Sequence, residues 1–158
     1  MATLNEKSRG MGLVGEVMRY VLTGRGLLTY GASLLTASIK ILPESATPDV
    51  QALFASASYA PGPKRRLADE PGMTSGVWQM RPLSRGHVEA RSPRPEDQPS
   101  INPRYLDDER DRRAIIGGLR RVRAWFQAPA LARYLVAETL PGPDVQTDDE
   151  FLGYVRQN

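Results

Sequence analysis

Apolar side chains recur every three or four positions in several parts of the chain, and this spacing predicts helices. In the first such stretch the apolar stripe comprises Val14, Val17, Met18, Val21 and Leu22. It predicts a helix over residues 13–22. The glycines at positions 24 and 26 end it, because glycine readily adopts the left-handed conformation that closes a helix.

The C-terminal third holds the longest periodic stretch, over residues 108–127, with Asp107 or Asp108 as its N-cap. The stripe expected to be buried comprises Ile115, Leu119, Val122 and Phe126. A shorter helix is predicted over 130–138, and a rigid turn over 141–143 follows it. Thr147 and Glu150 form a capping box, which predicts a last helix over 148–157.

Strands are predicted where the pattern changes to short apolar or alternating runs. Residues 27–42 predict one or two strands with a bend at Gly31, and residues 50–59 and 74–81 predict one strand each. A short strand is expected over 87–91, after a turn at residues 84–86 in which Gly86 supplies a positive φ. Prolines 93, 95, 99 and 103 then keep the chain extended until Tyr105.

The order of these elements is one helix, then strands, then helices, which predicts a single domain over residues 1–158. The fold class expected is α+β, an antiparallel sheet with helices packed on one face. Residues 60–72 are expected to form a polar surface excursion, because proline and glycine punctuate them.

Composition excludes several classes of protein. The chain has no cysteine and one histidine, so a disulfide, a thiolate nucleophile or a multi-histidine metal site cannot form within it. No run of about 18 apolar residues predicts a membrane span, and no secretory signal is recognised, which makes a cytoplasmic location the expectation. The net charge of +3 is too small to indicate a nucleic-acid partner by itself.

Two candidate sites are weak on the residues alone. Residues 10–15 match G-x-G-x-x-G, but a dinucleotide site needs a strand immediately before the motif, and LNEKSR does not predict one. His87 could serve as a general base, yet it has no carboxylate or serine partner at a meaningful spacing. We therefore expect a glycine-containing helix at the first and a structural strand residue at the second.

The stretch PLSRGHVEARSPRPEDQPSINPRYL, residues 82–106, resembles the substrate-binding half of the glucose-methanol-choline (GMC) flavin oxidoreductases. The matching positions are Pro82, Ser84, Arg85, Gly86, Val88, Ser92, Pro95, Asp97, Pro99, Ile101, Pro103, Tyr105 and Leu106, with Asp111 in the following helix. The similarity extends to Asn158 and back towards Leu4-Asn5. It implies the same α+β fold.

The resemblance also implies what this stretch lacks. In the family the FAD fingerprint lies far upstream, and the catalytic histidine lies in an H-P-x-G-T-x-x-M-G motif beyond the position of Asn158. The expectation is therefore a segment of an FAD-dependent alcohol oxidoreductase, choline dehydrogenase-like, that alone holds no flavin, no catalytic residue and no metal ligand. We expect the isolated chain to be inactive and to self-associate or pair with the missing FAD domain.

The resemblance implies that this segment forms the wall of the substrate pocket. The residues placed there are Thr36, Leu53, Tyr59 and Trp78. Choline-oxidising relatives carry a carboxylate where Thr36 stands, which argues against a choline-like cation. Each of the four is alternatively a core or rim residue, and Arg85 is expected to pair with Asp97 or Asp111 rather than with substrate.

Two other classes remain open. A non-catalytic binding or assembly module differs from the enzyme segment only in what surrounds it. A nucleic-acid-binding domain is suggested by seven arginines over residues 104–123, but four acidic residues in the same segment cancel much of their charge.

Overall fold

The computed structural model describes residues 3–31, 33–60 and 66–157, and it has an α+β fold, as predicted. The chain divides into two compact units, one of residues 1–37 and 52–77 and the other of residues 38–51 and 78–158. Three strands form one sheet in the order β1 (Leu35–Ile39), β2 (Val50–Ala55), β3 (Thr74–Gln79).

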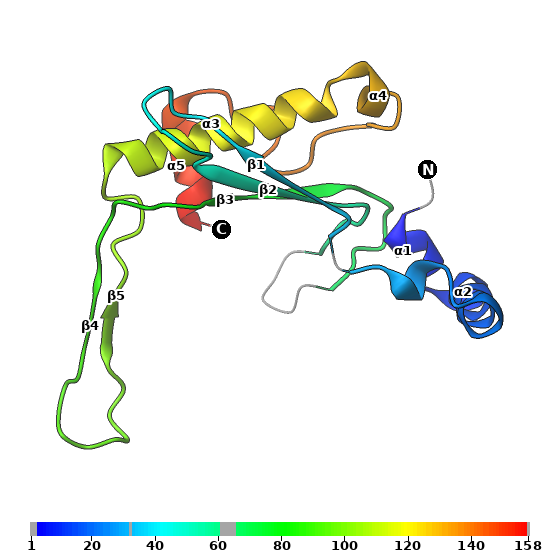
Figure 1. The fold of residues 1–158 in the computed structure, drawn as a ribbon, viewed down its shortest axis with the longest axis horizontal. Helices are drawn as coiled ribbons and strands as arrows, with labels where there is room; N and C mark the ends of the chain where they lie inside the picture. The colour runs from blue at the N-terminus through cyan, green and yellow to red at the C-terminus, as the bar shows by residue number, and fades with distance from the viewer. Residues whose placement is uncertain (1–2, 32, 61–65, 158) are drawn as a thin grey trace. The chain divides into compact units, whose positions relative to one another are not determined.

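The first unit begins with two helices, α1 (Leu4–Lys7) and α2 (Gly10–Thr23), which pack together, and the 3₁₀ turn η1 (Leu27–Thr29) packs on α2 (Figure 1). Gly24 ends α2 with φ of 62°, the left-handed closure that was predicted. The prediction of strand from residue 27 onward is wrong at its start, because residues 27–29 close a single helical turn onto the carbonyl of Gly26. The strand begins only at Leu35.

The strand predicted over 50–59 ends at Ala55, and residues 56–58 follow as an irregular segment. Tyr59 lies beyond β2 and pairs with Leu67 in an isolated antiparallel bridge. The strand predicted over 74–81 is confirmed as β3. The excursion predicted over 60–72 lies partly outside the described residues, at 61–65.

The second unit carries a two-stranded ribbon, in which β4 (His87–Glu89) pairs antiparallel with β5 (Ser100–Asn102) (Figure 1). The sequence predicted β4, whereas β5 was taken for extended loop because prolines flank it. Gly86 is needed for a different reason than predicted. A Cβ there would lie 2.2 Å from the carbonyl oxygen of Asn102, so the close approach of the returning strand, not a positive φ, requires glycine.

Helix α3 (Glu109–Phe126) is the longest element, and α4 (Pro129–Ala132) and α5 (Asp148–Gln157) follow it. Asp108 caps α3 by accepting a hydrogen bond from the amide of Arg110 at 2.8 Å, as predicted. The helix predicted over 130–138 shortens to four residues. The capping box at Thr147 is confirmed, because Glu150 accepts its amide at 2.8 Å.

The core of the second unit lies mainly along α3 and against α5. Of the predicted stripe, Ile115 and Val122 are buried and Leu119 and Phe126 are half-buried. Phe151 of α5 is fully buried, and the guanidinium carbon of Arg123 lies 4.8 Å from the centre of its ring. Arg123 also pairs with Glu138 at 2.7 Å, so one arginine joins α3 to the segment between α4 and α5.

Candidate functional site

A buried carboxylate holds the stretch that carries the P-x-S-R-G motif. Asp111, in the first turn of α3, is only 1% exposed. Its Oδ2 accepts the amide of Ser84 at 2.7 Å and its Oδ1 accepts the amide of Leu83 at 2.9 Å. The side-chain amide of Gln79, on β3, donates to Oδ1 at 2.5 Å. Residues 79–84 are thereby fixed to the start of α3.

The hydroxyl of Ser84 completes this arrangement. It donates to Oδ2 of Asp111 and accepts the amide of Asp108 at 3.0 Å, so it satisfies an otherwise unpaired donor at the N-terminus of α3. Burial by itself raises the pKa of Asp111, but the hydrogen bonds from Leu83, Ser84 and Gln79 outweigh that effect and lower the pKa below its ordinary value. Asp111 therefore stays ionised as a structural anchor.

Arg85 does not pair with Asp97 or Asp111, and the prediction that it would is wrong. Its guanidinium donates to the carbonyl of Pro82 at 2.8 Å and to that of Ser84 at 3.1 Å. Asp111 is already occupied by amides and a hydroxyl from the same turn. Asp97 pairs instead with Arg94 at 3.0 Å, within the ribbon loop.

The four residues predicted to line a substrate pocket lie on or next to the three-stranded sheet. Thr36 is an exposed residue of β1, and Leu53 is a half-buried residue of β2. Tyr59 lies four residues beyond the end of β2, and Trp78 is an exposed residue of β3. The first three belong to the first unit and Trp78 to the second. Their roles remain predictions.

A second buried carboxylate was missed by the sequence reasoning. Asp49 accepts the amide of Ile41 at 2.7 Å and that of Leu42 at 2.9 Å, and its own carbonyl accepts the amide of Met80 at 2.8 Å. Burial opposes ionisation, yet these amides hold the pKa of Asp49 below its ordinary value. The signal for it was an aspartate directly before a buried strand, where turn amides need an acceptor.

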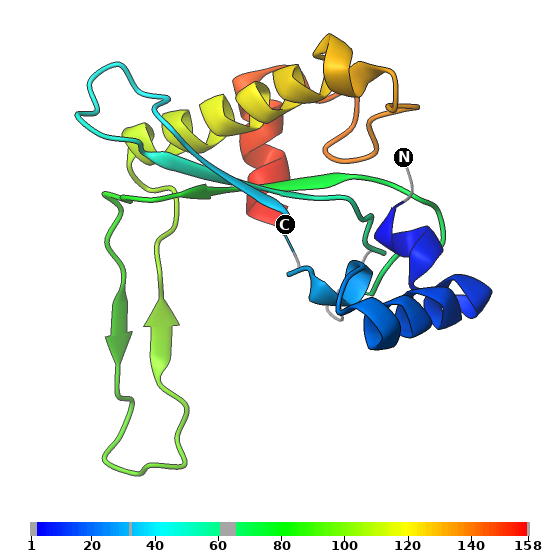
Figure 2. The same ribbon diagram turned by 45° about the vertical axis from the view of Figure 1, so that its right-hand side comes forward.

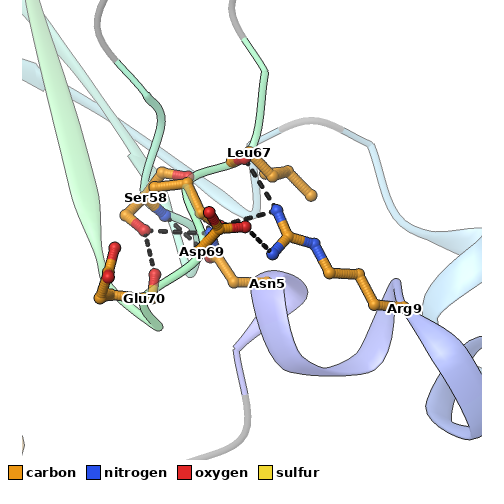
Figure 3. A network of polar contacts seen from close by, with 7 residues as sticks. Asn5, Arg9, Ser58, Leu67, Asp69 and Glu70 are labelled. Carbon is orange, nitrogen blue, oxygen red and sulfur yellow. Dashed lines mark hydrogen bonds and ion pairs between the residues drawn. The ribbon is translucent and has the colours of Figure 1, made fainter.

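The first unit has its own polar network, centred on Asn5 (Figure 3). The side-chain amide of Asn5, buried at the start of α1, donates to the carbonyls of Ser58 and Ala68 at 2.9 Å each, and its oxygen accepts the amide of Ser58 at 2.9 Å. Arg9 reaches the same segment through the carbonyl of Leu67 at 2.9 Å and the carboxylate of Asp69. Asn5 thus fixes the chain on both sides of the bridge at Tyr59.

The remaining candidates occupy structural positions. Residues 10–15 form the first half of α2 and follow α1, so the glycines do not lie at a strand-to-helix turn. His87 lies exposed on β4, opposite Asn102. Within the described residues, no group of three or more histidine, cysteine, aspartate or glutamate side chains could hold a metal ion. No helix among these residues is long and apolar enough to cross a bilayer.

Comparison with known proteins identifies the region that contains Ser84 and Asp111. The sequence model of the family described as GMC oxidoreductase matches residues 82–158, the part that begins at the P-x-S-R-G motif and contains α3 and α5. The chain belongs to the GMC oxidoreductase family.

The curated relatives cover more of the chain. An "Alcohol dehydrogenase [acceptor]" of Pseudomonas putida is 34% identical over 145 residues, which are 92% of this chain and 26% of that protein. An "Oxygen-dependent choline dehydrogenase" of Pseudomonas fluorescens is 38% identical over 89 residues, 56% of this chain and 16% of that protein. The chain thus spans about a quarter or less of the length of these relatives.

Proposed function

We propose that this chain is the substrate-domain segment of an FAD-dependent alcohol oxidoreductase and forms the wall of its substrate pocket. The observation that carries the proposal is the hydrogen-bonded anchor between Ser84 and Asp111, which joins the P-x-S-R-G motif to α3 within the region that matches the GMC oxidoreductase family. In the whole enzyme, FAD would supply the hydride-transfer chemistry, and this segment would supply the shape of the pocket and the orientation of the alcohol.

The wall would be formed by Thr36, Leu53, Tyr59 and Trp78, on or beside the sheet. Such pockets are mostly apolar with a few oriented polar groups, and this set contributes two aromatic rings, one aliphatic side chain and two hydroxyls. A threonine at position 36 cannot neutralise a trimethylammonium group. The set therefore favours a neutral alcohol over a choline-like cation.

The isolated chain would hold no flavin and would be inactive, and it would pair with the FAD-binding part of the enzyme. The pairing with the FAD-binding part is supported by three apolar side chains that are exposed on or beside the sheet, those of Leu34, Leu35 and Trp78. A cytoplasmic location belongs to the same proposal.

A flavin titration of the purified chain tests this assignment. FAD is added to protein whose folding has been verified by circular dichroism, and binding is followed by flavin fluorescence and absorbance. The proposal predicts an unperturbed flavin spectrum. Tight stoichiometric binding with a shifted spectrum would overturn it and return attention to the glycines of residues 10–15.

A non-catalytic assembly module is the second candidate. It is supported by the same exposed apolar side chains, and in it the four residues of the proposed pocket wall would not contact a substrate. Light scattering with and without a separately expressed FAD-binding part distinguishes the two. A self-associated species that does not bind the FAD-binding part would favour the assembly module.

A further inference from the structure

Helix α2 exposes its apolar side chains and buries its small and charged ones, which is the reverse of an ordinary surface helix. Its face towards α1 carries Gly12 and Glu16, and its other faces carry nearly all its large apolar side chains. A Cβ at Gly12 would lie 3.1 Å from the carbonyl oxygen of Glu6, which shows how closely this small face packs on α1. A helix of a water-soluble protein normally buries its apolar stripe instead.

The charged side chain on the inner face is neutralised there. Glu16 is 7% exposed, pairs with Lys7 at 2.9 Å and accepts the amide of Leu27 at 2.8 Å. Arg19 lies 4.0 Å from the same carboxylate. Because Glu16 is the sole acidic residue of α2, the outward surface of this helix presents no negative charge.

The outward surface is a continuous apolar stripe, which we call the α2 stripe. Its members are Met11, Val14, Val17, Met18, Val21 and Leu22. Met11, Val21 and Leu22 are 83%, 72% and 74% exposed, so the stripe is open to solvent at both ends of the helix. Figure 2 shows α2, in blue, as one continuous helix next to α1. Apolar side chains gathered in one patch, unlike scattered ones, mark an interaction surface.

The charges beside the stripe are positive. Arg19 lies on α2, with its side chain 56% exposed, and Arg25 lies exposed just beyond the C-terminal end of the helix. Tyr20, half-exposed on the same helix, has the apolar ring and polar hydroxyl that favour the boundary between membrane and water. An apolar face flanked by cations is typical of helices that lie in the headgroup region of a bilayer.

The charges beside the stripe favour a bilayer as its occupant. A bilayer requires no matching contour, and its anionic headgroups complement Arg19 and Arg25.

We propose that α2 lies in the surface of an anionic phospholipid bilayer, with the α2 stripe among the acyl chains and the two arginines at the headgroups. This contact is parallel to the membrane plane and goes beyond the prediction that the chain has no membrane partner, which rested on the absence of a spanning run. It uses only residues of α1, α2 and the segment from α2 to η1, so it does not depend on the proposed enzymatic function.

The test is flotation of the full 158-residue chain with vesicles of phosphatidylcholine alone and of phosphatidylcholine with phosphatidylglycerol. The proposal predicts binding to the anionic vesicles that Val21→Glu or Leu22→Glu weakens at least tenfold. Val136→Glu is the matched control. It changes the net charge equally at a fully exposed valine outside α2 and leaves binding within about twofold.

A double substitution, Arg19→Gln with Arg25→Gln, is expected to weaken binding to anionic vesicles by about 20-fold at low salt. The proposal is overturned if the unaltered chain binds neither kind of vesicle, or if the Val21→Glu and Val136→Glu variants bind the anionic vesicles equally. It is also overturned if light scattering shows that Val21→Glu separates a dimer that does not bind vesicles, because the stripe would then belong to a second copy.

Discussion

The amide of Ser84 donates to the carboxylate of Asp111 at 2.7 Å, across 27 residues of sequence. Between these two residues lie the ribbon of β4 and β5 and the irregular segment before α3. The pair therefore closes a long excursion at its base. It explains why an acidic residue in the first turn of α3 accompanies the P-x-S-R-G motif.

Removing this anchor is expected to destabilise the protein strongly. Asp111→Ala removes the buried carboxylate and leaves the amides of Leu83 and Ser84 without this acceptor, which costs about 3 kcal/mol of unfolding free energy. The matched variant is Asp107→Ala, which removes a half-exposed partner of Arg104 and costs less than about 1 kcal/mol. Urea denaturation of both variants measures the difference. Equal losses would contradict a special role for Asp111.

Stability is expected to fall in acid. The pKa values of Asp49 and Asp111 are lowered in the folded state relative to their ordinary value of 3.8. Their contribution is therefore complete above the unfolded value and is lost as the pH falls through the lower, folded values. Unfolding free energies measured from neutral pH down to about pH 3 should show this decline. Asp111→Asn should reduce its slope, whereas an unchanged slope would assign the decline to other groups.

Substitution of Gly86 tests the close approach of the ribbon strands. A Cβ at this position meets main-chain atoms of Asn102 and Pro103 within 2.5 Å, so Gly86→Ala must separate the strands and is expected to cost about 2 kcal/mol. Gly153→Ala is the control, because its Cβ meets nothing within 4 Å and lies inside α5. That change should stabilise the protein by about 0.5–1 kcal/mol. Thermal unfolding of the two variants should shift in opposite directions.

Arg123 is expected to be the arginine of α3 that stability depends on most. Its guanidinium bonds to Glu138 and to the carbonyls of Gly142 and Val145, and it lies over Phe151. Arg123→Met should cost about 2–3 kcal/mol, because it leaves a largely buried carboxylate and two carbonyls unpaired. Lysine should not restore the loss, since it lacks the planar fork.

The exposed Arg121 provides the comparison for this prediction. Arg121→Met should change the unfolding free energy by no more than about 0.5 kcal/mol. The unfolding free energy of both variants is measured by denaturant unfolding, and their tertiary packing by the near-ultraviolet circular dichroism signal. A loss at Arg121 as large as that at Arg123 would contradict the account.

The sequence predicted the helices well where caps and periodicity agree. Asp108, Gly24 and the box of Thr147 with Glu150 all act as their residue types indicate, because capping depends on local chemistry. It failed where a long-range contact decides. Residues 27–29 have a strand-like composition but form a helical turn, and the amide of Leu27 at its start is held by the carboxylate of Glu16 on α2. Likewise, β5 forms because β4 pairs with it.

The candidate site divides in the same way. The motif around Ser84 and its companion Asp111 could be recognised in the sequence. The hydrogen bonds between the two could not be predicted from it. Asp49 was overlooked, because a single aspartate before a strand is not distinctive until its amide partners are brought together by folding. The roles of Thr36, Leu53, Tyr59 and Trp78 rest on the family resemblance, and the fold alone does not decide them.

The most direct measurement of the proposed function is the steady-state kinetics of a chimera. In it, this chain replaces the matching 145 residues of the Pseudomonas putida alcohol dehydrogenase, and FAD loading is verified by absorbance. If the segment forms the pocket wall, Leu53→Ala and Trp78→Ala should lower kcat/KM for an apolar alcohol by about tenfold, and Val136→Ala should leave it unchanged. Unaltered kinetics in FAD-loaded Leu53 and Trp78 variants would contradict the assignment of these strands to the substrate pocket.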